Sequence, residues 1–210
     1  MRTSKTTRDR ILAILAATYG GAATALEYGS PFELLVAVVL SAQCTDTRVN
    51  IITARLFPAY DTPAKMLALG EDGLAERIRD CGLFRGKARN LIAACGMLIN
   101  DYGGEVPGTF ADLTRLPGVG RKTANVLLSQ LFAVPAIAVD THVFRVANRL
   151  GLANGKTPEQ VEEGLMKVVP RRDWGDAHHW LIWHGRKICK ARRPDCGQCP
   201  LKELCPSAFK

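Results

Sequence analysis

The stretch Leu116-Pro-Gly-Val-Gly-Arg-Lys-Thr-Ala124 determines how the rest of the chain is interpreted. Its proline and two glycines, Gly118 and Gly120, predict a tight turn between helices, and the second helix begins at Arg121. A glycine turn that leads into a helix offers backbone N–H groups, at the positive end of the helix dipole, to an anion such as a phosphate. An ordinary helix–turn–helix corner with a solvated Lys122 fits the stretch equally well, so other parts of the sequence must distinguish the two.

Helical periodicity runs through almost the whole chain, and strand candidates are scarce. The segment 31–41 is apolar nearly all round, which predicts a central buried helix. Short connections between the helices predict an all-α architecture with pairwise packing. Further helices are expected over residues 46–57, 64–69, 71–81, 85–102, 109–116, 121–133, 141–150, from 158 onward, and 173–188.

Composition indicates a globular protein with a polyanionic partner. Hydrophobic residues make up 47% of the 210 residues, charged residues make up 23%, and the net charge is +8. Residues 171–210 hold nine Lys or Arg and four Asp or Glu, a net +5, so most of the excess lies in the last fifth of the chain. Localised positive charge suggests a polyanion partner, although a basic pI alone is weak evidence.

The amino terminus imitates a signal peptide, because basic residues 2–10 precede the apolar run 11–17. The run is short and ends at Thr18-Tyr-Gly-Gly21, so we interpret it as the first helix of the fold. No stretch approaches the roughly 20 apolar residues of a membrane span. Seven cysteines, an odd number, do not form a disulfide framework, and a reducing cytoplasm is expected.

Four cysteines at the carboxyl end form the most specific chemical signal. They lie within seventeen residues, in a loop rich in proline and glycine, and can surround one metal centre. Structural zinc and an iron–sulfur cluster both accept four thiolates, but the uneven spacing favours the cluster. Disulfides fit the compartment poorly. The predicted ligands are Cys189, Cys196, Cys199 and Cys205.

Three basic residues between the first two cysteines, Lys190, Arg192 and Arg193, form a cationic loop that such a centre would hold in shape. Phosphate binding is one interpretation of this loop and a solvated surface is the other. The local charge favours phosphate binding.

The glycine turn, the run Val139-Asp-Thr-His142 and the cysteine pattern together resemble the endonuclease III family of iron–sulfur helix-hairpin-helix DNA glycosylases. The resemblance extends from about Pro31 to Cys205. It implies a six-helix barrel over residues 24–134, with the helix-hairpin-helix motif at about 112–133. It also implies a second helical domain, residues 1–23 with 135–210, that carries a [4Fe–4S] cluster, and an active cleft between the two domains.

Residue by residue, the resemblance implies that Lys122 and Asp140 are catalytic. Gly118, Val119 and Gly120 match the hairpin that grips the DNA backbone. Beside them, Arg121 is expected to contact DNA. His142 is expected to support the site, and its alternative role is to cap its helix and pack. Gln43 and Leu83 match the pair that fills the gap left by an extruded nucleotide. Without the resemblance, Gln43 would be interpreted as a polar residue at a helix end and Leu83 as a core residue. Cys44, Thr114 and Arg85-Gly86 depart from the family pattern and leave the damage preference open.

The chemistry explains why these residue types suit the reaction. A base inside a duplex is unreachable, so the nucleotide must leave the stack. A free lysine amine has a pKa of about 10.4, so a nucleophilic Lys122 needs that pKa lowered, and Arg121 and the helix start both act in this direction. Asp140 would accept the amine's proton and stabilise oxocarbenium character, or it would simply cap its helix.

These considerations predict a bifunctional glycosylase and abasic-site lyase that removes oxidised pyrimidines through a lysine Schiff base and cuts 3′ to the lesion. The expected partner is double-stranded DNA with oxidised pyrimidine or abasic sites. A monomer without membrane association, in a bacterial cytoplasm at the nucleoid, is expected. Three alternatives remain: a mismatch adenine or thymine glycosylase of the same superfamily, a weakly active iron–sulfur protein that scans DNA, and a zinc-stabilised transcription factor.

Overall fold

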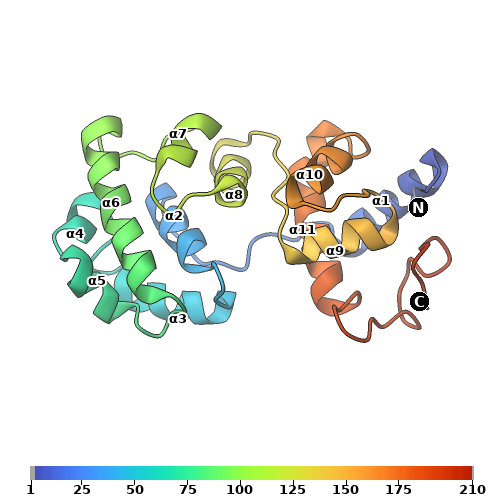
Figure 1. Ribbon diagram of the computed structural model, residues 1–210, viewed down its shortest axis with the longest axis horizontal. Coiled ribbons are helices and arrows are strands. Elements are labelled where there is room, and N and C mark those ends of the chain that lie inside the picture. Colours follow the sequence, from blue (N-terminus) through green and yellow to red (C-terminus); the bar gives the residue numbers. More distant parts are fainter. Residues whose placement is uncertain (1–2, 210) are drawn as a thin grey trace. The chain divides into compact units, whose positions relative to one another are not determined.

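The computed structural model describes residues 3–209, and within this range it contains helices and no strand (Figure 1). The predicted all-α fold class is therefore confirmed. The chain divides into two compact units, which are described separately: Ala25–Ala133, and Met1–Thr24 together with Val134–Lys210.

The unit Ala25–Ala133 is built around helix α2 (Pro31–Leu40). Every residue of α2 from Phe32 onward is buried except Glu33, which confirms the predicted central helix. α2 contacts α3, α6 and α8, and α6 also packs against α4 and α5. The other helices of this unit are α3 (Asp46–Leu56), α4 (Pro63–Leu67), α5 (Gly70–Arg77), α6 (Phe84–Tyr102), α7 (Phe110–Arg115) and α8 (Arg121–Phe132).

Several helices begin at capping residues that the sequence displays. The side chains of Thr45, Thr62, Thr109 and Thr157 each accept a hydrogen bond from the backbone N–H three residues ahead. This satisfies one of the donors that a helix start leaves unpaired.

The prediction for the helix over 71–81 is wrong at its end, because α5 stops at Arg77. Ile78 leaves helical geometry and is fully buried, and the Cys81 thiol donates a hydrogen bond to Leu40 O (3.3 Å). These tertiary contacts end the helix before residue 81.

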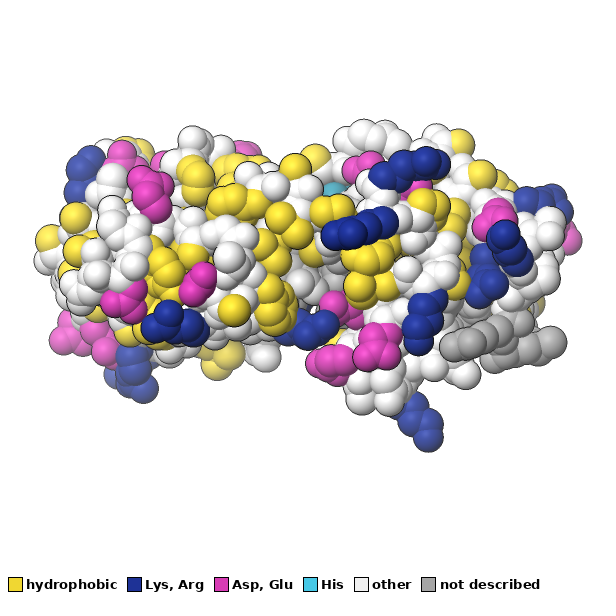
Figure 2. Space-filling view, turned by 90° about the horizontal axis from the view of Figure 1, so that it is seen from above, with side chains coloured by type: hydrophobic (Ala, Val, Ile, Leu, Met, Phe, Trp, Pro, Cys, Tyr) yellow, Lys and Arg dark blue, Asp and Glu magenta, His cyan; other side chains and the backbone are white. Residues whose placement is uncertain are grey.

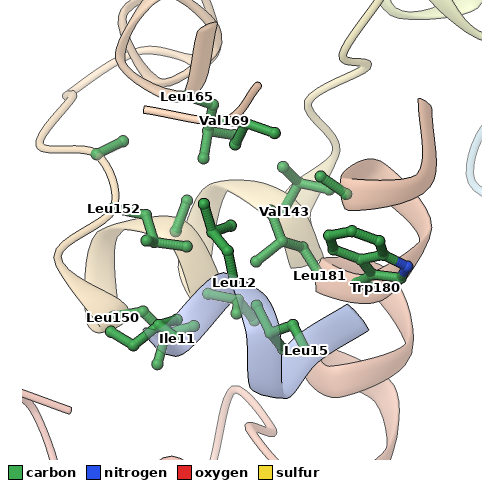
Figure 3. Close-up of a cluster of buried hydrophobic side chains, with 14 of the residues drawn as sticks. Ile11, Leu12, Leu15, Val143, Leu150, Leu152, Leu165, Val169, Trp180 and Leu181 are labelled. Carbon is green, nitrogen blue, oxygen red and sulfur yellow. The ribbon is translucent and has the colours of Figure 1, made fainter. Parts of the chain in front are cut away.

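The second unit joins the amino-terminal helix to the last third of the chain. Leu12 and Leu15 pack with Val143, Leu181 and other buried side chains in one cluster (Figure 3). Fully burying each leucine contributes about 1.5–3 kcal/mol, so the segment interpreted as a helix, not a leader, is part of the core. The helices are α1 (Lys5–Tyr19), α9 (Thr141–Leu150), α10 (Pro158–Met166), the 3-10 turn η1 (Arg171–Asp173) and α11 (Trp174–Lys187).

Residues 136–139 form no regular element before α9. None of the helices between residues 3 and 209 is both long and apolar enough to cross a membrane. On the face shown in Figure 2, basic side chains lie among acidic ones and do not form a continuous patch.

Candidate functional site

The turn between α7 and α8 has the geometry of a backbone anion site. Gly118 has φ of +84°, which strongly favours glycine, and a Cβ there would lie 3.0 Å from Asn90 Cβ. Gly120 is the N-cap of α8 and has no side-chain cap. The N–H of buried Val119 instead donates to Leu116 O (3.0 Å) and holds the turn closed. The turn therefore leads the chain directly to an uncapped helix start.

Arg121 and Lys122 occupy the first turn of α8, as the sequence predicts, and both are exposed. The Arg121 guanidinium lies over the Phe110 ring, 5.3 Å from its centroid. Thr114, one of the positions that departs from the family pattern, donates its hydroxyl to Phe110 O (2.9 Å) within α7. Lys122 thus lies at the positive end of the α8 dipole, directly after a turn that a backbone hydrogen bond holds closed.

Asp140 is the N-cap of α9, and its Oδ1 accepts the Val143 N–H at 2.7 Å. This part of the expectation for Asp140 is confirmed. His178 Nδ1 donates to Ala138 O (2.6 Å) and fixes the segment just before Asp140. His142 Nδ1 lies 3.2 Å from Arg145 Nη2. The carboxylate is therefore held by the first turn of its own helix, and His178 holds the segment that precedes it.

Gln43 and Leu83 lie on two connections of the unit Ala25–Ala133, and both have left-handed backbone conformations, with φ of 54° and 59°. Leu83 is 65% exposed, which is unusual for a large apolar side chain, and Gln43 is also exposed. A Cβ on Gly82 would lie 3.2 Å from Gln43 O, so the two connections are in close approach.

The four carboxyl-terminal cysteines line one cavity of about 140 Å³. Burial raises the pKa of the Cys199 and Cys205 thiols, and the charges of the neighbouring cysteines raise both further. Four thiolates in one cavity therefore require a cationic centre to offset their repulsion. Within residues 3–209, no three His, Cys, Asp or Glu side chains converge closely enough to hold a single metal ion. Four thiols around one cavity are a donor set that an iron–sulfur cluster takes.

Two arginines of α9 hold the loop that follows the first cysteine, a role that the sequence did not reveal. Arg149 donates from Nη1 to Lys190 O (2.7 Å) and from Nη2 to Ala191 O (3.1 Å). Arg145 Nε donates to Cys189 O (3.1 Å). The sequence signal for this role is the i, i+4 spacing of the two arginines on a helix that contains no acidic residue. Lys190, Arg192 and Arg193 are all exposed beyond this anchor.

Buried polar residues around the cavity were also missed. His184 is 1% exposed, its Nδ1 lies 3.1 Å from Tyr19 Oη, and its Nε2 lies 3.7 Å from Cys199 Sγ. Burial lowers the pKa of His184 to about 4. Its partners are 165 and 15 residues away in sequence, so no local pattern identifies it.

Two known protein-family models match the chain over most of its length. The family model described as HhH-GPD superfamily base excision DNA repair protein matches residues 36–171, and the iron–sulfur binding domain of endonuclease III matches residues 189–205. Endonuclease III of Rickettsia conorii is 55% identical over 201 residues, which are 96% of each chain. The chain belongs to the endonuclease III family.

Other endonuclease III proteins agree with this assignment. The protein of Escherichia coli K12 is 52% identical over 202 residues, again 96% of each chain. A solved structure described as a trapped endonuclease III–DNA covalent intermediate has 48% identity and a TM-score of 0.94, over 98% of this chain and 97% of that chain. The predicted fold and family are therefore confirmed, and the family assignment supports a [4Fe–4S] cluster at the four cysteines.

Proposed function

We propose that this endonuclease III family member is a base excision repair DNA glycosylase with abasic-site lyase activity that acts on double-stranded DNA carrying oxidised pyrimidines or abasic sites. Family membership supports the reaction class. The observation that carries the proposal is Lys122 in the first turn of α8, directly after a glycine hairpin with an uncapped helix start.

In this proposal Lys122 is the nucleophile. Its amine attacks the sugar C1′, and the bond between C1′ and the damaged base breaks as the new C–N bond forms. Asp140 takes up the amine's proton and stabilises positive charge on the sugar. The positive end of the α8 dipole favours the uncharged amine. The sugar ring then opens at the C1′–O4′ bond, with a proton going to O4′, and an imine forms. The imine acidifies the C2′ proton, and loss of that proton expels the 3′ phosphate and cuts the strand.

DNA binding is assigned to two sets of groups. The hairpin residues Gly118–Arg121 and the basic residues Lys190, Arg192 and Arg193 contact phosphates, which positions the duplex without reading its sequence. Gln43 and Leu83 fill the gap left by the extruded nucleotide, one with donor and acceptor groups for the orphaned base and one as an apolar plug. His142 supports the site through its contact with Arg145.

Cys189, Cys196, Cys199 and Cys205 hold the cluster in this proposal. When bound, the cluster supplies a covalent cross-link for a loop that is too small to fold alone. Arg145 and Arg149 hold the same loop from α9 through its carbonyl groups. We further propose that the protein acts as a monomer in the bacterial cytoplasm, at the nucleoid.

The test compares matched duplexes that carry an oxidised pyrimidine, an abasic site, or an adenine or thymine mismatch. Base release and 3′ strand cleavage on the first two substrates, with little release from mismatches, is the expected result. Preferential release from mismatches without cleavage would assign the chain to the mismatch glycosylases. Tight binding without release from any substrate would assign it to the scanning proteins.

A further inference from the structure

A buried lysine outside the proposed chemistry links the two connections that carry Gln43 and Leu83. Lys87 lies in the first turn of α6 and is 6% exposed, although lysine is almost never buried unless it is paired. Its Nζ donates to Leu40 O (2.8 Å), Ala42 O (2.6 Å) and Cys81 Sγ (3.0 Å). An ammonium has three protons, and these three acceptors use all of them without a carboxylate.

The three acceptors lie on both connections. Leu40 is the last residue of α2, where the helix dipole favours a cation, and Ala42 immediately precedes Gln43. Cys81 lies two residues before Leu83, and its thiol donates to the same Leu40 carbonyl (3.3 Å). One ammonium group therefore contacts both connections, one residue before Gln43 and two residues before Leu83.

The backbone conformations of Gln43 and Leu83 are unfavourable, so surrounding contacts must stabilise the two connections. Gln43 and Leu83 both adopt the left-handed region, which is unfavourable for a residue other than glycine. Such conformations persist only when the surroundings impose them. Gly82 faces Gln43 O so closely that an added Cβ would lie at 3.2 Å. The buried lysine and this close backbone contact fix the spacing of the two connections.

We propose that Lys87 is a positioning residue that joins the segments 40–43 and 81–83 into one preformed wedge. This inference rests on the proposed function, because it takes Gln43 and Leu83 to be the residues that replace an extruded nucleotide. Without the ammonium, the two side chains would have to be ordered separately at each insertion, and the cost of that ordering reduces the rate.

The direct test is amide hydrogen exchange on the DNA-free holoprotein with Lys87→Met, which keeps the stem and removes the donors. The amides of Cys44 and Cys81 are bonded to Ser41 O and Ile78 O, so each reports on one connection. Faster exchange at both, with the rest of the unit unchanged, is expected. Unchanged exchange at either connection overturns the proposal, whether or not the protein is active.

The functional test separates positioning from general destabilisation. Lys87→Met is expected to slow single-turnover excision from duplex DNA on the order of 10–100-fold, as for a misplaced group. Borohydride trapping on a single-stranded abasic oligonucleotide, where no base pair must be replaced, is expected to stay at the wild-type rate. Equal losses on both substrates would overturn the proposal.

Non-additivity gives a further criterion. In a Gln43→Ala, Leu83→Ala background, Lys87→Met is expected to add no further loss of duplex excision, because the groups that it positions are gone. A loss as large as in the wild-type background contradicts the proposal. If the double alanine variant itself excises normally, the assigned gap-filling role fails, while hydrogen exchange still decides whether Lys87 joins the connections.

A second variant covers the case in which Lys87→Met does not fold. Gly82→Ala leaves Lys87 intact and forces Gln43 O away by a few tenths of an ångström. The same loss, confined to duplex substrates, is expected. Wild-type excision by this variant would show that the spacing of the two connections does not matter and would overturn the proposal.

Discussion

At Gly118 the backbone adopts a conformation that other residues rarely accept, and the space for a side chain is already occupied by Asn90. Gly118→Ala is therefore expected to lower the free energy of unfolding by about 1–2 kcal/mol and to weaken DNA binding. Gly96→Ala is the matched control, because Gly96 lies inside α6 with nothing within 4 Å of its added Cβ. This control should gain about 0.5–1 kcal/mol. Urea denaturation measures the free energy of unfolding of both variants. Equal changes in the two would contradict the explanation given for Gly118.

At His179 burial makes the folded protein sensitive to acid. Burial lowers the pKa of His179, and the charge of Asp176 opposes this only in part. Below the unfolded value of about 6.5, the unfolded chain takes up a proton that the folded chain does not, so the free energy of unfolding decreases as pH falls. Above that value neither state takes up this proton, so His179 no longer reduces the free energy of unfolding.

His179→Phe, which keeps an aromatic ring but cannot titrate, should reduce this loss. Urea denaturation at pH 7.5 and 5.5 measures the change for each protein. The variant should retain part of the dependence, since His184 has its pKa lowered to about 4 by the same cause. The argument fails if the wild type and the variant lose equal stability on acidification.

At the scale of elements, α9 positions the loop of the metal centre through Arg149, whose fork donates to two successive carbonyls. Arg149→Ala removes both contacts, together with the one from Nη1 to Cys189 Sγ (3.5 Å), and leaves all four cysteines in the chain. Because residues that orient metal ligands are worth roughly 10–100-fold in metal affinity, iron loss to a chelator should accelerate by that order. Visible absorption of the cluster follows the loss.

Arg172→Ala is the control, since it removes the same charge from an exposed side chain that forms an ion pair with its neighbour Asp173. It should lose iron at the wild-type rate. Similar acceleration by both variants would assign the effect to net charge and not to the anchor.

The helices of this chain were predictable where their signals are local. Two helix starts are marked by a threonine cap followed by proline, at Thr62-Pro63 and Thr157-Pro158. Both the hydroxyl cap and the proline act within one turn of the helix. The end of α5 was not predictable, because Ile78 and Cys81 leave the helix for partners elsewhere in the unit.

The candidate site shows the same division between local and distant causes. Lys122 and the N-cap role of Asp140 follow from short motifs, and the structure places both residues at helix starts. Lys87 and His184 could not be found in this way. Their partners lie up to 47 and 165 residues away, and only the folded chain brings them together.

For the whole molecule, the net charge of +8 and the exposed basic loop predict salt-dependent binding to undamaged DNA. Neutralising phosphates releases counterions, so log affinity should fall linearly with log salt, with a slope of about −0.9 per phosphate contacted. Arg192→Ala should make the slope shallower by about 1 if Arg192 makes one such contact. A flat plot for the wild type would contradict phosphate-dominated binding.

The central claim is that the Lys122 amine forms a Schiff base with the deoxyribose. Borohydride reduction of the holoprotein with duplex DNA carrying an abasic site, followed by peptide mass analysis, tests it most directly. The account predicts a covalent adduct on Lys122 that disappears in Lys122→Ala. The adduct should persist in Lys65→Ala, which removes an exposed lysine from the first turn of another helix. An adduct of undiminished yield in Lys122→Ala, or one attached to another residue, would contradict the account.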